Sequence, residues 1–325
     1  MKKIIFIILS VFLLANLHGQ TLKFEWVESP QGESESYAFK TATNISGDNY
    51  VSGQFSSATL TLGSYVLNNP TNNLRQVYLA KYNSQGTVIW AKHYSCPGES
   101  HIDGMTIDAD ENLIIMGRFS QTITFGAITL SNVNPYNLSV FMGKIFPTGE
   151  VMWMTGLGNS STTLVTSFAY DLASDNTGNI YIAGDYTQGD FIINDSLTLP
   201  NTGPNNYFVA KFNSEGILQW AKNGHTSATI GSPGWESTID VDTSGNVYLS
   251  GPFNSSISFD STGVSNTNSG IRTFLTKFNS DGQPQFVTQF GDTGYVYPKD
   301  LKIDYNDKLY LLGGFGQTDL LLGST

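Results

Sequence analysis

The residues best spaced to bind a ligand are the oxygen-bearing side chains Asp108, Asp110 and Asn112. They alternate along a short segment, as the ligands of a calcium-binding loop do. However, Glu111 stands where such a loop needs a glycine for its sharp turn, and no bidentate Glu follows. The related positions elsewhere in the chain hold Thr, Ser or Asn. We therefore predict a hairpin turn, keep these three residues as weak calcium candidates, and predict no other metal or cofactor.

No set of residues in the sequence predicts a catalytic site. There is no Gly-x-Ser-x-Gly segment and no His-Glu-x-x-His motif, and His93, His101 and His225 lack an obvious Ser and acid framework. The only cysteine, Cys96, is expected to be structural or incidental. Three glutamates that stand in similar contexts between repeats are expected to serve loops: Glu33, Glu99 and Glu236. Paired carboxylates that cleave glycosidic bonds stay open as an alternative, because the fold assembles them and sequence spacing does not.

An internal repeat predicts the strands and turns that would position any functional site. Five segments end in Gly-x-aromatic, and an Asp or Asn stands nine residues before each glycine. These glycines are Gly53, Gly117, Gly184, Gly251 and Gly313, separated by 64, 67, 67 and 62 residues. Segments such as Asp-Thr-Ser-Gly-Asn carry turn signals, with Gly where a positive φ is needed. Each repeat is therefore expected to consist of antiparallel strands joined by tight turns.

A second block lies between these glycines. It contains a lysine, then a glycine five residues later, then a large aromatic residue four residues further on. The lysines are Lys81, Lys144, Lys211 and Lys277, and the aromatic residues are Trp90, Trp153, Trp220 and Phe286. A catalytic residue is normally singular, whereas these recur once per repeat. We therefore interpret the lysines as structural partners and the aromatic residues as core of the repeat.

The repeat predicts an all-β fold, a β-propeller with four-stranded antiparallel blades of about 65 residues. The segments around the lysines are apolar on both faces, as expected for a sheet that neighbours cover on each side. One position in them is always small, which suits close packing of sheets: Ala80, Gly143, Ala210 and Thr276. An additional hairpin is expected within each repeat, for example at 256–260. A β-solenoid is the main rival, but its coils are usually shorter than this repeat.

The first residues of the chain predict export. Lys2 and Lys3 precede an apolar run from Ile4 to Ala15, which is the order of a secretory signal and too short for a comfortable membrane span. No later stretch is long and apolar enough to cross a bilayer. We predict a signal peptide over 1–19 and one repeat domain over 20–325. The repeats are expected near 38–94, 101–157, 168–224 and 235–290, with a partial repeat over 298–325.

Both ends of the repeat domain predict an incomplete ring. Phe24-Glu-Trp26-Val resembles the segments around Trp90 and Trp220, and is expected to be the last strand of a blade whose other strands lie elsewhere. The partial repeat over 298–325 lacks a lysine block. We expect the natural protein to be longer than this chain and to carry further blades.

The pattern Asp-x-x-Gly-Asn-x-Tyr-x-x-Gly, then Phe-x-x-Lys-Phe-Asn-x-x-Gly-x-x-x-Trp, resembles the SBBP-type β-propeller repeat of secreted bacterial proteins. Residues 175–220 match it best, whereas the second repeat departs at Glu111 and Phe146-Pro147, and the fourth at Phe286. The resemblance covers nearly all of the chain after the signal. It implies a propeller that is secreted or held at the cell surface, in a Gram-negative bacterium. The family has no single activity, so no functional residue carries over.

The amino-acid composition limits the classes of binding partner that we expect. A net charge of −11 opposes binding to nucleic acid or to an anionic membrane, since both need a basic surface. The variable loops are rich in Asn, Ser, Thr, Tyr and Gly, which suit adaptable polar contacts. We predict an exported, non-enzymatic scaffold or binding module for extracellular proteins or glycans. The alternative is an extracellular polysaccharide hydrolase or lyase with its site in the propeller channel.

Overall fold

The computed structural model describes residues 31–32, 36–71, 74–132, 134, 136–158, 166–187, 189–228, 237–267, 270–291 and 294–316. The signal segment over 1–19, the segment around Trp26, and the side chains of Glu33 and Glu236 lie outside them. In this described part the structure is all β, which confirms the predicted fold class. It contains no helix, and so none of a length and hydropathy that would cross a membrane.

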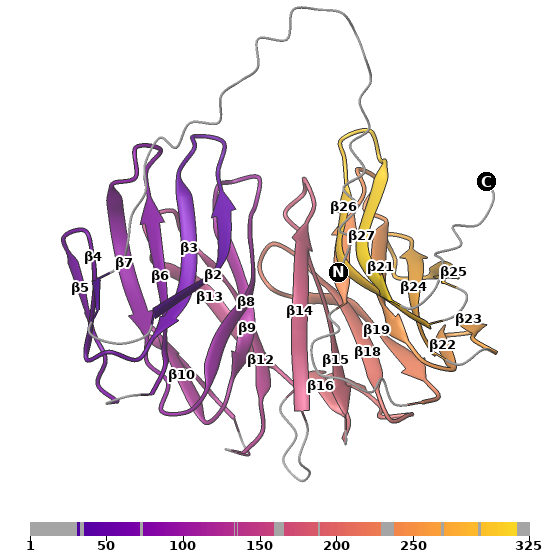
Figure 1. The fold of residues 1–325 in the computed structure, drawn as a ribbon. Helices are drawn as coiled ribbons and strands as arrows, with labels where there is room; N and C mark the ends of the chain where they lie inside the picture. Colours follow the sequence, from indigo (N-terminus) through magenta and orange to yellow (C-terminus); the bar gives the residue numbers. More distant parts are fainter. Residues whose placement is uncertain are drawn as a thin grey trace, which may run out of the picture.

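Four antiparallel groups of four strands follow one another as the blades of a β-propeller, and the last two groups belong to larger, six-stranded sheets (Figure 1). Blade 1 contains β2 (Ser36–Thr43), β3 (Asn49–Phe55), β6 (Gln76–Tyr82) and β7 (Val88–Tyr94). Blade 2 contains β8 (Ser100–Ile107), β9 (Leu113–Phe119), β12 (Ser139–Ile145) and β13 (Val151–Leu157). Blade 3 contains β14 (Thr166–Ser174), β15 (Ile180–Thr187), β18 (Asn206–Phe212) and β19 (Leu218–Thr226). Blade 4 contains β20 (Thr238–Val241), β21 (Val247–Phe253), β24 (Gly270–Phe278) and β25 (Pro284–Phe290). A further antiparallel pair follows, β26 (Gly294–Ile303) and β27 (Leu309–Gly316).

Each blade also carries a short hairpin between its second and third strands. The hairpins are β4 (Thr59–Leu62) with β5 (Tyr65–Asn68), β10 (Thr122–Phe125) with β11 (Ile128–Ser131), β16 (Phe191–Asn194) with β17 (Leu197–Leu199), and β22 (Ser256–Phe259) with β23 (Thr262–Ser265). A hairpin packs against the preceding blade: Phe259 lies in one buried cluster with Tyr207 and Val209 of blade 3. The end of the preceding outer strand also pairs with it, as His225 of β19 does with Ser258 of β22. At the start of the described chain, β1 (Gln31–Gly32) pairs with β4 at the equivalent positions, Gln31 with Thr61.

The core consists of clusters between neighbouring blades. Between blades 2 and 3, Met142, Phe191 and Phe208 are fully buried in one cluster. The innermost strands touch in chain order, β2 with β8, β8 with β14, β14 with β20, and β20 with β26. Among the described strands, no contact of similar extent leads from β26 back to β2. The ring is therefore incomplete in this part of the chain.

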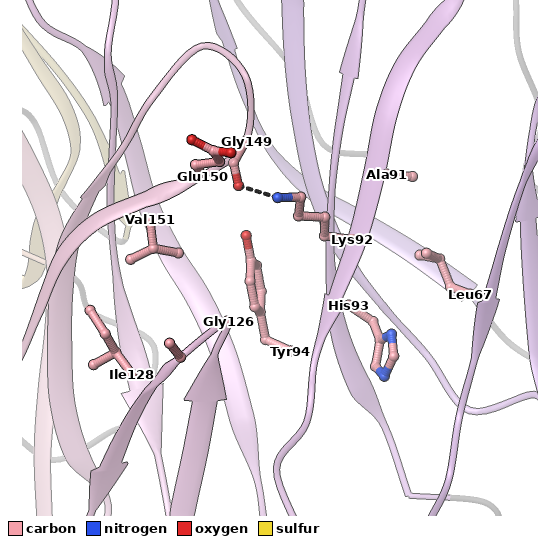
Figure 2. A pocket seen from close by; sticks show the side chains of 11 residues that line it. Leu67, Ala91, Lys92, His93, Tyr94, Gly126, Ile128, Gly149, Glu150 and Val151 are labelled. Carbon is pink, nitrogen blue, oxygen red and sulfur yellow. Dashed lines mark hydrogen bonds between the residues drawn. The ribbon is translucent and has the colours of Figure 1, made fainter.

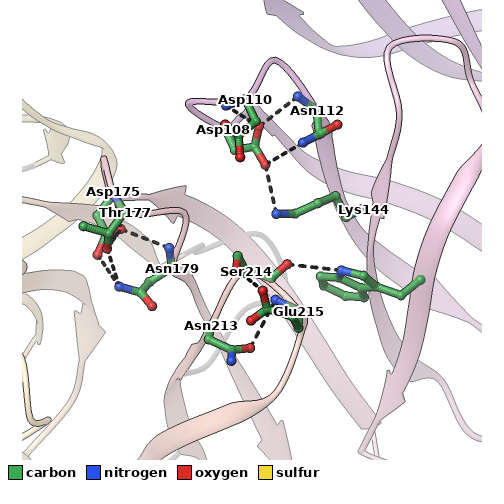
Figure 3. Close-up of polar contacts among 11 residues, drawn as sticks. Asp108, Asp110, Asn112, Lys144, Asp175, Thr177, Asn179, Asn213, Ser214 and Glu215 are labelled. Carbon is green, nitrogen blue, oxygen red and sulfur yellow. Dashed lines mark hydrogen bonds and ion pairs between the residues drawn. The ribbon is translucent and has the colours of Figure 1, made fainter.

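The aspartates of the repeat shape the turns between the first and second strands. Asp175 Oδ1 accepts hydrogen bonds from the backbone N–H of Thr177 at 2.9 Å and of Asn179 at 3.0 Å (Figure 3). Asp242 binds the N–H groups of Ser244 and Asn246 in the same way. Burial opposes ionisation of Asp175, but the hydrogen bonds from Asn179, Thr177 and Tyr181 outweigh it and lower its pKa. The turn at Asp175 is therefore held by a charged carboxylate, and hydrogen bonds from Asn246 and Ser244 likewise lower the pKa of Asp242 against the effect of burial.

Candidate functional site

A β-bulge recurs at one position of the innermost strands. The pairing of β2 with β3 shifts between Ala38 and Lys40, and that of β14 with β15 shifts between Ala169 and Asp171. Strands β8 and β26 have bulges at the equivalent positions. The residues inside the bulges are Phe39, Asp103, Tyr170 and Lys299. A bulge redirects the side chains around it and often lies next to a functional site.

The repeat glycine is required by this arrangement. A Cβ atom added to Gly184 would overlap the carbonyl oxygen of Phe168 in the innermost strand. At Gly53 and Gly117 it would overlap the carbonyl oxygens of the equivalent residues, Tyr37 and His101. A side chain at these positions would push the innermost strand away. The glycines therefore fix the position of the bulge and of the residues that flank it.

The residues before the bulges form what we call the aromatic column: Tyr37, His101, Phe168 and Tyr297. Each stands 16 residues before its repeat glycine, and so does Trp235, which lies outside the described residues. Our reading of the sequence missed this column, although the fixed spacing of 16 residues was available to find it. The innermost strands that carry these residues follow one another around the propeller and are in contact in chain order, with β20 between β14 and β26.

The rings of the aromatic column contact further aromatic and cationic side chains. Tyr37 stacks on Phe39, and Phe168 stacks on Tyr170, each with ring centroids 5.9 Å apart. Phe39 also reaches across to His101 of the next blade, at 6.2 Å. Three cations lie over rings of the column at distances that allow cation–π attraction. They are Arg75 over Tyr37 at 5.3 Å, Arg118 over Phe168 at 5.3 Å, and Lys299 over Tyr297 at 5.5 Å.

Paired charges accompany these rings. Arg118 Nη1 donates to Asp103 Oδ1 at 2.9 Å, and His101 Nε2 lies 3.1 Å from Glu99 Oε1. Glu99 and His101 line a hollow of about 300 Å³ together with Arg75. This part of the molecule thus combines partly exposed aromatic faces with charged hydrogen-bonding groups. Such a combination can bind a ligand that has both apolar and polar surface.

Asp185 is an acidic group of this region whose pKa lies well above its ordinary value. It stands on β15 opposite Tyr207 and accepts a hydrogen bond from Tyr170 OH at 3.3 Å. Desolvation raises the pKa of Asp185 to about 7, and the Tyr170 hydrogen bond only partly opposes this. Burial, together with the charge of Asp185, also raises the pKa of Tyr207. Near neutral pH, Asp185 can therefore hold or release a proton.

Replacing Asp185 by Asn should raise the stability of the protein over that of the wild type, and this gain should be larger at pH 8 than at pH 4. The pKa of about 7 in the folded protein lies above the ordinary value of 3.8, so the cost of burying the ionised carboxylate is absent below the lower value and complete above the higher one. Wild-type protein therefore loses stability as the pH rises from about 4 to about 7, by at most about 4 kcal/mol. The measurement is Tm of both proteins across this range. An equal difference in Tm at both ends would show that Asp185 does not titrate in this window.

The calcium candidates do not form a cation cage. Asp108 Oδ1 accepts from the N–H groups of Asp110 at 3.0 Å and Asn112 at 2.8 Å (Figure 3). Asp108 Oδ2 forms an ion pair with Lys144 at 2.9 Å. These contacts are those of a hairpin turn. Within the described ranges, no group of three or more His, Cys, Asp or Glu side chains is placed to hold a metal ion.

The repeated lysines lie on the third strand of each blade. Lys81 pairs with Asp48 at 2.9 Å, and Lys277 lies 3.6 Å from Asp242. Lys211 instead donates to the carbonyl oxygen of Ser280 in the next blade, at 3.3 Å. Lysines also lie over the tyrosine of the neighbouring strand, for example Lys211 over Tyr181 at 5.4 Å. These lysines therefore join strands and blades, and none of them lies in the aromatic column.

The repeated tryptophans connect each blade to the next. Trp90 donates its indole N–H to the carbonyl oxygen of Pro147 at 3.0 Å, in a turn of blade 2. Trp153 and Trp220 donate in the same way to Ser214 at 3.3 Å and Ser280 at 3.0 Å. Phe286 pairs with Lys277 as Trp220 pairs with Lys211, but it has no such turn beside it among the described residues and is 39% exposed.

The histidines of the described residues stand on three different blades, and the cysteine is buried. His93 and His225 stand on the outer strands of blades 1 and 3, whereas His101 stands on the innermost strand of blade 2. Cys96 is fully buried, and burial raises the pKa of its thiol. A thiol in such surroundings is a poor nucleophile, because the thiolate is the reactive form.

A second cavity, of about 500 Å³, lies between the outer parts of blades 1 and 2 (Figure 2). Lys92 extends across it and donates to the carbonyl oxygen of Gly149. The hydroxyl of Tyr94 is buried there without a hydrogen-bond partner in the described part, and burial raises its pKa. Glu150 and Ile128 are also among the residues that line it. The cavity therefore lies at the junction between blades 1 and 2.

No family model matches the chain, so its resemblance to the SBBP-type repeat rests on the residues alone. The chain is 23% identical over 196 residues to the uncharacterized WD repeat-containing protein L264 of Acanthamoeba polyphaga mimivirus. That match covers 55% of this chain and only 14% of the viral protein. Among solved structures, this chain is similar to the major Malassezia sympodialis allergen Mala s 1, with 9% identity and a TM-score of 0.34. The match covers 89% of this chain and 91% of the allergen chain. A member of the DUF4221 family from Bacteroides vulgatus has 10% identity and a TM-score of 0.31 over 87% and 92%. Neither structural likeness carries an argument about function.

Proposed function

We propose that this chain is an exported, non-enzymatic β-propeller protein of the SBBP repeat class that binds extracellular proteins or glycans. The observation that carries the proposal is the aromatic column with its bulges. Four blades or part-blades contribute a ring at the same position, and three of these rings have a cation over them. Aromatic and arginine side chains dominate the binding energy of protein interfaces.

The chemistry of the column fits a glycan or a polar protein surface. The paired rings of Phe168 and Tyr170 offer flat apolar area, and Arg118 with Asp103 offers charged donors and acceptors beside it. Aromatic side chains such as Tyr, which combine an apolar ring with a solvated polar group, are suited to such ligands. Because the charges of both signs are present, we do not infer a strongly anionic or cationic ligand.

Retention on a panel of immobilised polysaccharides and peptides tests the binding function. Phe168→Ala and Tyr37→Ala should each weaken binding of a retained ligand by about tenfold or more, as expected for a central aromatic contact. Tyr305→Ala is the matched control, because Tyr305 is an exposed aromatic residue in the turn between β26 and β27. Equal loss in all three variants, or none in the first two, would contradict the role of the aromatic column.

Export is the second part of the proposal. The basic residues and apolar run before Asn16 support it. Protein recovered outside the cytoplasm should begin at or near Gln20 when its N-terminus is sequenced. Exported protein that keeps Met1 would contradict the predicted signal peptide.

One observation favours the enzymatic alternative, a polysaccharide hydrolase or lyase. Asp185 has a pKa raised to about 7, which is the property of a general acid at neutral pH. The same panel, scored for released products, separates the two functions. Turnover that Asp185→Asn abolishes would replace the binding proposal with the enzymatic one. Retention without any product supports the binding proposal.

A further inference from the structure

The cavity between blades 1 and 2 corresponds in position to an ion pair at the junction between blades 3 and 4. Lys92 and Lys222 each stand two residues after a repeated tryptophan and occupy the same position in the strand pairing. Lys222 lies 2.7 Å from a carboxylate oxygen of Asp260, in the turn of the hairpin of blade 4. At that junction a side chain of the protein therefore supplies the anion that pairs with the lysine.

The junction between blades 1 and 2 has no such carboxylate, because Gly126 is the counterpart of Asp260. Each of the two residues begins the turn of its hairpin, and each has a positive φ, 60° and 50°. A Cβ atom added to Gly126 would have no atom within 4 Å, so the space beside this turn is open. Among the described residues, Lys92 forms no ion pair and donates to the carbonyl oxygen of Gly149. Its ammonium group therefore faces the cavity without contact to a described carboxylate.

Tyr94 adds a buried hydroxyl to the same cavity. The side chain is 2% exposed, and its hydroxyl has no hydrogen-bond partner among the described residues. Figure 2 shows this hydroxyl pointing toward the end of Lys92. The counterparts of Tyr94, four residues after the other repeated tryptophans, are Leu157 and Gly224, so the packing of a blade does not require a hydroxyl here. A buried donor without a partner is costly, and a ligand that accepts from it removes this cost.

We propose that this cavity binds a small monocarboxylate with an apolar body. The carboxylate of the ligand takes the position that the side chain of Asp260 has at the other junction. It accepts hydrogen bonds from the ammonium group of Lys92 and from the hydroxyl of Tyr94, and hydrogen bonds to a charged acceptor are stronger than those between neutral groups. The proposal does not depend on the aromatic column or on its ligand.

The rest of the lining specifies the body of the ligand and its charge. Leu67, Ile128 and Val151 offer apolar side chains to the body. The cavity volume of about 500 Å³ lies within the range of roughly 300–1,000 Å³ that is usual for small-molecule sites. Glu150 repels a second negative charge on the ligand, and burial lowers the pKa of His93, so that its imidazole is neutral at pH 7. The lining therefore favours one negative charge on an apolar body.

Calorimetric titration of the full chain with three monocarboxylates of different shape tests the proposal. The probes are octanoate, 3-phenylpropionate and indole-3-acetate, each beside its uncharged amide of the same shape. We expect at least one carboxylate to bind with a Kd below about 1 mM, and its amide to bind at least about tenfold more weakly. Failure of all three carboxylates to bind in this range, or equal binding of carboxylate and amide, would overturn the proposal.

Tyr94→Phe separates a binding role of the hydroxyl from a structural one. The variant should bind the retained carboxylate about fivefold more weakly while its Tm does not fall, because the hydroxyl has no described partner to lose. A lower Tm with unchanged affinity would show that the hydroxyl serves the fold alone, and would contradict its place in the site.

Two further variants test the position of the carboxylate. Gly126→Asp copies Asp260 at a turn with the same positive φ, and its carboxylate should pair with Lys92 and weaken binding of the ligand at least about tenfold. Lys92→Met should weaken binding to a similar extent. Lys222→Met is the matched control and should leave binding unchanged, because Asp260 already pairs with that lysine. Equal effects of the two lysine variants, or full binding by Gly126→Asp, would place the ligand elsewhere and overturn the proposal.

Discussion

Replacing Lys144 by Ala should lower the free energy of unfolding by about 3–5 kcal/mol. The side chains of Lys144 and Asp108 are only 3% and 2% exposed, and their charged atoms are 2.9 Å apart. Removal of the lysine leaves the carboxylate of Asp108 buried with its turn hydrogen bonds but without a counter-charge. An unpaired buried charge costs far more than an exposed one, because the low-dielectric surroundings cannot solvate it. Urea unfolding followed by tryptophan fluorescence measures the loss.

The matched control is Lys277→Ala, at the equivalent position of blade 4. The side chain of Lys277 is 25% exposed and lies 3.6 Å from Asp242, so solvent screens the pair. We expect a loss of less than about 1 kcal/mol, as for other exposed ion pairs. Equal losses for the two variants would mean that burial of the pair does not determine its contribution.

Replacing Trp90 by Ala should cost about 3–5 kcal/mol as well, through a cavity and not through charge. Trp90 is buried between blades 1 and 2, its ring lies against Gly149, and its indole N–H donates to Pro147. The change therefore removes packing area and a hydrogen bond across the blade junction. Calorimetry should show a lower Tm with one transition.

Phe286→Ala is the control for Trp90→Ala within the same repeated column. The sequence treats Trp220 and Phe286 as equivalent, and their strand pairing is the same. Their surroundings differ, because a turn of the next blade lies against Trp220 at Gly282 and no described turn lies against Phe286. The loss for Phe286→Ala should therefore stay near about 1 kcal/mol. A loss as large as that of Trp90→Ala would show that Phe286 is covered in solution.

The repeat spacing predicted most of the fold because it reports local geometry. A glycine nine residues after an aspartate marks a turn and the strand that follows it. In the structure those turns are the Asx turns of Asp175 and Asp242. The extra hairpin expected at 256–260 is β22 with the start of its turn. Such features depend on residues a few positions apart, so a single sequence contains them.

The candidate site was less accessible from sequence because distant residues build it. Arg118 and Phe168 are 50 positions apart and meet only because β9 and β14 belong to adjacent blades. The high pKa of Asp185 arises from burial beside Tyr207, which no spacing rule predicts. The aromatic column could have been found from its 16-residue spacing. Its proximity to cations could not, since Arg75 and Arg118 do not recur in the repeat.

The pairing of outer strands with the next blade's hairpin has a consequence for cooperativity. His225 of β19 pairs with Ser258 of β22, Gly158 donates to Ile192, and Gln31 of β1 pairs with Thr61 of β4. The end of each outer strand is therefore hydrogen-bonded to the hairpin of the next blade, and not only to its own sheet. Neighbouring sheets are joined by backbone hydrogen bonds in this way. In a linear array of repeats, strong coupling between neighbours makes the unfolding of single repeats rare. Pulling on one end should then unravel several sheets in one step, since each sheet that opens takes a pairing partner from the next.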